Sequence, residues 1–165
     1  MSEENQGNTQ PAVSMESTQP AISMEKIYVK DMSLEVPHAP KIFFERANPP
    51  QIDIQVQTQA SSVEQNVFEV VVIATVTAKH DEKVMFLIEV KQAGIFRMRN
   101  VSATELETVM GVMCPNILFP YLRETVSDAT VRAGFAPALL NPINFDALYQ
   151  MRKQQLHEAS TATAH

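Results

Sequence analysis

The chain has 165 residues, of which 45% are hydrophobic, and it carries a formal net charge of -6 at pH 7. This length and composition predict one globular domain with a substantial core, and the acidic balance argues against nucleic acid as the main partner. A basic partner would suit this charge, although mild acidity is also ordinary for a cytoplasmic protein.

The two ends of the chain differ in composition from its middle. Residues 1–25 are polar and contain a near-repeat, TQPAVSME at 9–16 and TQPAISME at 18–25. A nine-residue offset is too short for a stacked repeat unit, so we predict a disordered N-terminal tail over residues 1–25. The last residues are small and polar, which predicts a disordered tail at 159–165 and a folded domain at 26–158.

The start of the chain has no signal-peptide pattern, and no stretch approaches the roughly 20 apolar residues of a membrane span. The single cysteine excludes an internal disulfide and permits a reducing compartment. We therefore expect a cytoplasmic protein without direct membrane insertion.

Four segments in the first half of the chain have the pattern of β-strands. In chain order they are IYVKDMSLEV, QIDIQVQT, VFEVVVIATVTA and VMFLIEVKQ. The third is apolar on both faces through its middle, as a central strand should be, and the others alternate between apolar and polar residues. The pattern predicts a four-stranded antiparallel sheet with one apolar face and one partly acidic face.

The segment VPHAPKIFFERANPP separates the first two predicted strands. It contains four prolines and no glycine, and it is too long for a tight hairpin. Because it also carries Phe43 and Phe44, we predict a crossover loop that packs over another part of the domain.

The second half of the chain is predicted to be helical. Ser102 and Glu105 have the spacing of a capping box, which marks a helix start. Pro115 is expected to end or kink this helix near Cys114, because proline lacks the N–H that the helical ladder needs. Pro120 is tolerable only where a second helix begins close to it. Strands followed by helices indicate an α+β domain.

The second predicted helix has a continuous apolar stripe that ends before Gly134, a natural C-cap. The stripe consists of Leu118, Leu122, Val126, Ala129 and Ala133. Apolar residues cover more than half of this helix, and such a helix must be buried on several sides. Oligomerisation is the economical solution in a small chain; an unusually central helix inside a monomer is the alternative. A last helix is predicted after Asn144.

The titratable residues form no recognisable catalytic or metal-binding pattern. The histidines fall in predicted loops or the tail, and Cys114 has no second cysteine with which to bind zinc. Four glycines in the whole chain form no phosphate-binding loop. We interpret Cys114 as a small buried hydrophobe, with a reactive thiol as the alternative. We predict no enzyme activity, cofactor or metal.

Several segments, in order, resemble the SecB family of protein-export chaperones. They are KIYVKDMSLEVPHAPKIF, FEVVVIATVTA, FLIEVKQAGIF, MCPNILFPYLRETVSDATVRAGF and NPINFDALY. The resemblance covers residues 26–150 and is most specific in CPNILFPYLRE and NFDALY. It implies a SecB-like fold that assembles as a homotetramer, a dimer of dimers, with the second helix where the two dimers meet. The residues then expected at this oligomer interface are Leu118, Leu122, Val126 and Ala129.

The resemblance also implies an ATP-independent chaperone that binds unfolded preproteins, keeps them translocation-competent and delivers them to the SecA ATPase. Such a protein must expose apolar surface that accepts many sequences, and several weak contacts on one oligomer add through effective concentration. The positions that match the SecA contacts of the family are Asp31, Glu35, Leu87 and Glu89. In the alternation pattern, all four residues fall on the polar, solvent-facing side of their strands.

A groove for the client polypeptide is expected beside the sheet. Its predicted walls are the aromatic residues Phe43, Phe44, Phe145 and Tyr149, with core packing as the alternative for each of them. A competing hypothesis for the whole protein is an oligomeric small-molecule-binding α+β protein or a thioesterase-like enzyme. That hypothesis requires a closed pocket with convergent polar groups.

Overall fold

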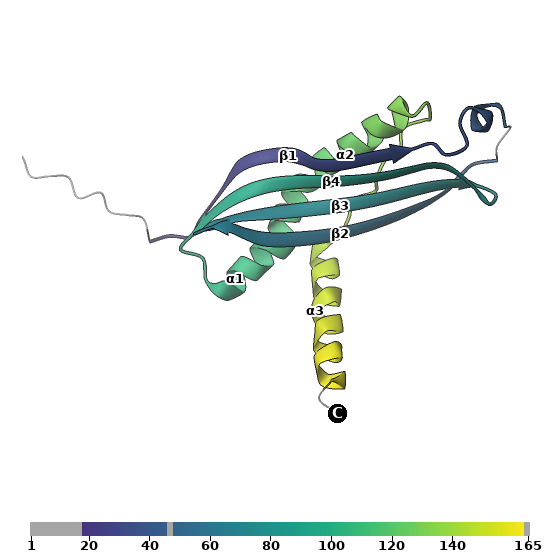
Figure 1. Ribbon diagram of the computed structural model, residues 1–165. Helices are drawn as coiled ribbons and strands as arrows, with labels where there is room; N and C mark the ends of the chain where they lie inside the picture. Colours follow the sequence, from purple (N-terminus) through teal and green to yellow (C-terminus); the bar gives the residue numbers. More distant parts are fainter. Residues whose placement is uncertain (1–17, 46–47, 164–165) are drawn as a thin grey trace, which may run out of the picture.

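The computed structural model describes residues 18–45 and 48–163 (Figure 1). The elements are β1 (Ala21–Glu35), the short 3-10 helix η1 (Lys41–Phe44), β2 (Gln51–Glu64), β3 (Val67–His80), β4 (Lys83–Arg99), α1 (Ala103–Thr108), the π-helical segment η2 (Val109–Met113), α2 (Cys114–Arg132) and α3 (Phe145–Ala162). Strands precede helices, which confirms the α+β class.

Both ends of the folded region differ from the sequence-based boundaries. The first octapeptide copy, at 9–16, lies outside the described residues. The second copy, assigned to the tail, contributes the start of β1 from Ala21 onward. At the other end α3 continues to Ala162, beyond the expected boundary at residue 158.

The four strands form one antiparallel sheet in the order β1-β4-β3-β2, so β1 and β2 are the edge strands. The turns between β2 and β3 and between β3 and β4 contain Asn66 and Asp81 with positive φ values of 62° and 51°. Asn and Asp tolerate this conformation better than most residues, which suits short hairpin turns. As predicted, β3 is central, and residues 70–74 are buried on both faces of the sheet.

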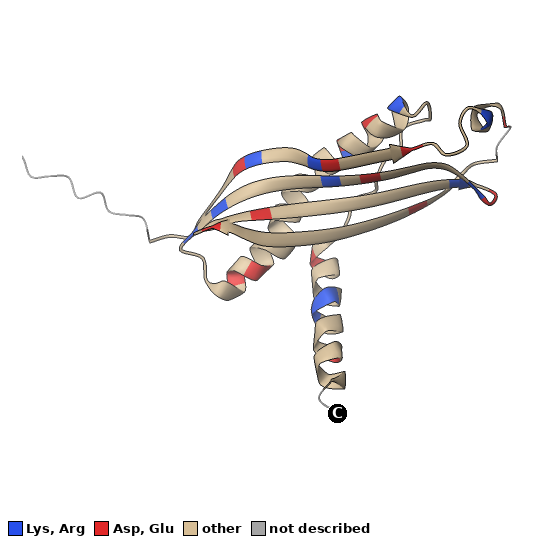
Figure 2. Cartoon of the chain, viewed as in Figure 1, with Lys and Arg blue, Asp and Glu red and all other residues tan. Residues whose placement is uncertain are grey.

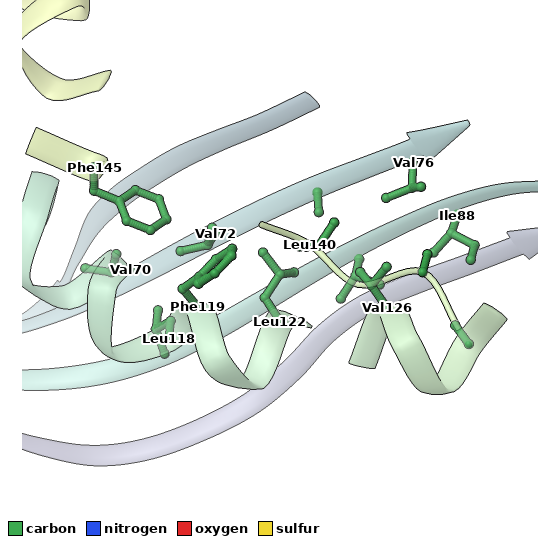
Figure 3. Packing of buried hydrophobic residues seen from close by; sticks show 14 of the residues in the cluster. Val70, Val72, Val76, Ile88, Leu118, Phe119, Leu122, Val126, Leu140 and Phe145 are labelled. Atoms are coloured by element: carbon green, nitrogen blue, oxygen red, sulfur yellow. The ribbon is translucent and has the colours of Figure 1, made fainter. Parts of the chain in front are cut away.

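Helix α2 crosses one face of the sheet and buries it (Figures 1 and 3). The apolar face of β3 and β4 meets the α2 stripe in the main core, where Val70, Val72, Val76, Ile88, Leu118, Leu122 and Val126 are fully buried. Gly94 permits the close approach, since a Cβ atom there would lie 2.8 Å from Leu118 Cδ2. We call this covered side the helix face of the sheet and the opposite side the open face.

The α2 stripe corrects one prediction about assembly. The residues expected at the oligomer interface, Leu118, Leu122, Val126 and Ala129, have at most 1% of their surface exposed within this single chain. They pack against the chain's own sheet, so they have no surface left to contribute to a second chain. The structure therefore assigns these residues to the core.

The helical start and end signals are confirmed, but the prolines act differently from the prediction. The capping box forms in both directions between Ser102 and Glu105, and Gly134 has a φ of 89° just after α2. Pro115 lies in the first turn of α2, where a missing N–H costs little.

Pro120 lies inside α2, so the second helix begins at Cys114 and not near this proline. Pro120 leaves the carbonyl of Asn116 without its helical partner. Both residues are exposed to solvent, and water can therefore bind the freed carbonyl.

Candidate functional site

The predicted SecA-contact residues lie together on the open face of the sheet. Glu35 is directly opposite Leu87, and Glu89 is opposite Ser33 on the neighbouring strand. Asp31 is opposite Lys91, which is two residues from Glu89 and therefore on the same face. The alternation in β4 causes this arrangement, because the intervening residues point into the core. The structure thus brings the predicted residues of β1 and β4 into one patch, which we call the acidic patch.

One basic residue sits inside the acidic patch. Lys91 Nζ lies 3.9 Å from Asp31 Oδ2 and 3.7 Å from Glu89 Oε1. Exposed ion pairs of this length contribute little to stability. A basic group of a partner can therefore replace Lys91 as the ion-pair partner of Asp31 and Glu89 at a small cost in free energy. The alternation pattern alone does not identify this pairing, because the position of Lys91 relative to Asp31 depends on the strand register.

Polar residues of the neighbouring strands extend the patch. A shallow depression of about 240 Å³ is lined by Glu89 and Lys91 together with Gln55, Gln57, Gln59, Ile73 and Thr75. The open face therefore offers hydrogen-bonding side chains beside the carboxylates. Figure 2 shows that both signs of charge occur along β1 and β4.

The opposite end of the open face contains a closed hydrogen-bonded cluster. Tyr28 donates its hydroxyl hydrogen to Glu69, and Lys30 Nζ lies 2.6 Å from Glu69 Oε2. The hydrogen bond from Lys30, followed by that from Tyr28, lowers the pKa of Glu69. Burial, assisted by the neighbouring carboxylate, raises the pKa of Tyr28 to about 12. Since Glu69 is already paired, the acidic patch is confined to the other end of this face.

The crossover segment packs over the end of the sheet, as predicted. Ile42 is buried, and the Phe43 ring lies 5.2 Å from the Phe135 ring, centroid to centroid. Phe44, in contrast, is 85% exposed. One helical turn thus anchors this segment through Ile42 and presents Phe44 to solvent.

Two polar contacts fasten the same segment to the β3–β4 hairpin. Lys83 Nζ lies 2.7 Å from Glu45 Oε1, and His38 Nδ1 lies 2.9 Å from the carbonyl oxygen of Val84. The ion pair with Lys83 lowers the pKa of Glu45. These contacts hold the crossover segment in place from both sides of η1.

The aromatic residues of α3 lie elsewhere, which corrects the prediction of one groove. Phe145 is 1% exposed and packs edge-on against Phe119, with 5.8 Å between the ring centroids. Tyr149 lies against Gly111, where an added Cβ would be 2.5 Å from Tyr149 Cδ2. Phe145 and Tyr149 both line the pocket described next, as the prediction of a groove required, whereas Phe43 and Phe44 do not. Phe145 is a core residue because it closes the end of the α2–sheet layer.

This pocket lies between α3, η2 and the free edge of β2, and it has a volume of about 910 Å³. Its apolar lining comes from Val56, Met110, Leu148, Met151 and Leu156, among others. Arg152 Nη1 donates a hydrogen bond of 2.8 Å to the carbonyl of Thr58, on the strand edge. Figure 1 shows that α3 projects away from the sheet, and its residues Leu148 and Leu156 remain 37% and 65% exposed.

The helix face of the sheet also has an uncovered apolar margin. Ile52 and Ile54 are opposite Ala78 and Val76 of the core but remain 45% and 42% exposed. Helix α2 packs chiefly on β3 and β4, so the edge strand β2 extends beyond its cover. The alternation of β2 was predicted correctly, and the exposure of its apolar side follows from where α2 lies on the sheet.

Potential metal ligands and the cysteine occur among the residues that the structure describes. Cys114 is fully buried, and burial raises the pKa of its thiol to about 12, which confirms its interpretation as a buried hydrophobe. No group of three or more His, Cys, Asp or Glu side chains in residues 18–45 and 48–163 is placed to hold a metal ion. No helix in this part of the chain is long and apolar enough to cross a membrane.

Comparison with known proteins gives consistent matches along most of the chain. The family model described as SecB, preprotein translocase subunit SecB, matches residues 15–156. The protein-export protein SecB of Nitrosomonas eutropha is 58% identical over 132 residues, which cover 79% of this chain and 82% of the relative. That of Chromobacterium violaceum is 55% identical over 157 residues, covering 95% and 98%.

A solved structure shares the fold at low sequence identity. The SecB-like chaperone of Mycobacterium tuberculosis, in complex with a peptide from an antitoxin, matches with a TM-score of 0.63 and 18% identity. The match covers 74% of this chain and 90% of the other. It supports the fold alone.

Proposed function

The chain belongs to the SecB family, and on this premise we propose that it is an ATP-independent chaperone that binds unfolded preproteins and delivers them to the SecA ATPase. In this role it is a binding protein of the cytoplasm, not an enzyme. The main support for this proposal is the apolar surface that the folded chain leaves exposed to solvent. The exposed residues on the helix face, in the crossover segment, in the loop between α2 and α3, and on α3 include Phe44, Ile52, Ile54, Leu139, Met151 and Leu156.

Open apolar surface of this kind suits an unfolded client. Soluble proteins rarely expose apolar patches beyond a few hundred Å² unless the patches bind something. Flexible Met and Leu side chains around the pocket can adapt to many sequences. The free edge of β2 beside this pocket additionally offers backbone groups to an extended chain. We therefore propose that clients bind along β2 and α3 and at Phe44.

The two binding functions use opposite sides of the sheet. The acidic patch lies on the open face, whereas Ile52 and Ile54 lie on the helix face. A basic segment of SecA can therefore bind the patch while a client occupies the apolar surface. This separation supports a transfer role, because the chaperone need not release its client before it meets the motor.

We further propose a homotetramer in which α2 uses its second face. Tyr121 and Val131 of α2, and Met113 at the end of η2 next to it, are exposed, although they are large and apolar. Arg123 lies 4.9 Å from the Phe119 ring, and its buried Nε has no hydrogen-bond partner among the described residues.

A denatured preprotein tests the proposed function directly. Mixed with the purified chain in the absence of ATP, it should form a stable complex detected by native mass measurement, and its aggregation should slow. The competing small-molecule hypothesis requires a closed polar pocket, whereas the β2–α3 pocket is open and largely apolar. Binding of small ligands without any binding of unfolded polypeptide would refute the chaperone proposal.

Charge reversal on the open face tests the SecA proposal. The triple variant Asp31→Lys, Glu35→Lys and Glu89→Lys should weaken SecA binding roughly 10–100-fold at low ionic strength, because each charge pair contributes a fraction of a kcal/mol to about 1 kcal/mol. The difference should shrink as salt is added. Client binding should not change, because the substituted residues lie on the face opposite the apolar surface.

A matched control separates local effects from net charge. The triple variant Glu82→Lys, Glu107→Lys and Glu158→Lys changes the net charge equally at exposed positions outside the acidic patch. It should bind SecA nearly normally. Equal losses in both variants, or normal binding by the first, would show that the acidic patch is only a solvated surface.

A further inference from the structure

One carbonyl group on the free edge of β2 is already bonded to a side chain of α3. The carbonyl oxygen of Thr58 accepts a hydrogen bond of 2.8 Å from Arg152 Nη1. Because α3 lies beyond the edge strand, this carbonyl points away from β3. In an antiparallel strand the N–H and C=O of one residue point to the same side, and the side alternates along the chain. Every second residue from Ile52 to Thr58 therefore turns its backbone groups out of the sheet.

These outward backbone groups belong to the residues whose side chains lie on the helix face. Side chains alternate along a strand with the same period as the backbone groups. Ile54 is opposite the buried Val76, and Val56 is opposite the buried Ala74. A polypeptide that paired with this edge would place the side chains of its bonded residues on the helix face too, because directly opposite residues share a face. The exposed Ile52 and Ile54 give those side chains an apolar surface.

The first turns of α3 fix the position of Arg152. Phe145 is buried, and Tyr149 lies against Gly111 of η2. Residues 145, 149 and 152 are spaced as i, i+4 and i+7, so they share one face of the helix. The two anchored rings therefore direct Arg152 toward β2. The guanidinium N–H takes the place at Thr58 that the backbone N–H of an added strand would take.

On the basis of the proposed client binding along β2, we propose that Arg152 limits how far a client can pair with this strand. A client can pair beside Ile52 and Ile54 while Arg152 stays in place. Pairing that continues past Thr58 must displace the guanidinium. Natural proteins protect sheet edges with charged side chains in the same way. Arg152 thus keeps client pairing short and reversible, and it acts as a specificity-determining residue of the client site.

An N-methylated peptide tests the pairing geometry on the unchanged protein. The probe is a short, capped, fluorescent peptide of alternating valine and threonine, which carries no charge. Its valine side chains should lie on the apolar helix face, so its valine N–H groups should bond to β2. Methylation of the valine nitrogens should weaken binding roughly 10-fold or more, since several hydrogen bonds are lost. Methylation of the same number of threonine nitrogens should change binding little. Equal effects of the two modifications would overturn the proposal.

Substitution of Arg152 tests its own role. Arg152→Ala should bind the unmodified peptide roughly 2–10-fold more tightly, because the peptide no longer has to displace one hydrogen bond. The valine-methylated peptide should show no such gain. Arg152→Lys retains a charged donor and should lose most of the gain. The matched control is Lys153→Ala, which removes the same charge from the next residue of α3, where Nζ lies 5.4 Å from the Tyr149 ring. It should bind as the unchanged protein does.

The direction of the change decides the role of Arg152. Weaker binding by Arg152→Ala would make Arg152 a direct client contact, and unchanged binding would make it a bystander; either result would overturn the proposal. An equal gain in Lys153→Ala would overturn it as well, because the effect would then come from charge alone. All variants should melt at the same temperature as the unchanged protein, since both side chains are exposed.

A denatured preprotein separates this proposal from the proposed function. If the preprotein binds normally while the peptide results contradict the expectations above, only the role of Arg152 is refuted. If neither the preprotein nor the peptide binds to the unchanged protein or to Arg152→Ala, client binding along β2 is refuted, and the role of Arg152 with it.

Discussion

Replacing Leu122 with alanine is expected to lower the free energy of unfolding by about 2–5 kcal/mol. Leu122 is fully buried between α2 and the sheet, near Val72 and Val126 (Figure 3). The substitution removes apolar contacts and leaves a cavity that the close-packed layer cannot fill. Denaturant unfolding at one fixed protein concentration measures the loss, because assembly would otherwise add to the apparent stability. The folded fraction should keep its native mass.

Substitution on the second face of α2 provides the control for assembly. Tyr121 and Val131 are 47% and 53% exposed in the single chain, so Tyr121→Ala and Val131→Ala should cost the chain itself little. If this face joins two dimers, native mass should fall from four chains toward two in these variants. A clean monomer at micromolar concentration for the unchanged protein would contradict the tetramer. If the Leu122→Ala variant dissociated into smaller oligomers while its free energy of unfolding stayed unchanged, Leu122 would have to be assigned to the oligomer interface after all.

The second large effect is expected at Phe145. Phe145→Ala should lower the free energy of unfolding by about 3–5 kcal/mol, because the ring is 1% exposed and packs on Phe119. Phe44→Ala should leave thermal stability unchanged and weaken binding of a denatured preprotein by about 1–3 kcal/mol, the range for a binding hot spot. Melting and binding must be measured on the same samples.

Phe43 gives an intermediate case that sharpens the comparison. Its ring is partly exposed but stacks on Phe135 and lies near Gly134, so Phe43→Ala should reduce both stability and binding. If the Phe44→Ala variant bound clients normally, the crossover segment would not be part of the client-binding site. If the Phe145→Ala variant had an unchanged melting temperature, the buried Phe145 ring would contribute less to stability than a core residue is expected to.

The same aromatic residues show where local patterns stop being informative. Phe43 and Phe44 are adjacent in sequence, yet one stacks on a neighbour and the other faces solvent. Their exposure depends on which way the η1 turn faces the end of α2, and no local pattern encodes that orientation. For Phe145, apolar spacing on α3 is equally compatible with a groove and with the core.

Local sequence signals were sufficient to predict several elements of the fold. Strict alternation in β2 and β4 predicted which residues share a face, because side chains in a strand alternate whatever the strand pairs with. The acidic patch follows from this alternation once β1 and β4 are neighbours. The capping box and the glycine after α2 were equally local, since each concerns one turn of backbone. The family resemblance rested on contiguous segments of the same kind.

The surface that α2 covers, and the surface that it leaves exposed, depend on long-range packing. Because α2 is apolar around more than half its surface, periodicity could not show that Leu118 and Leu122 face the chain's own sheet while Tyr121 faces away. The pairing of Lys91 with Asp31 and the open margin at Ile54 depend on register and on the reach of one helix across the sheet. These are contacts between segments far apart in the chain. Their burial is determined by packing geometry, which no local pattern contains.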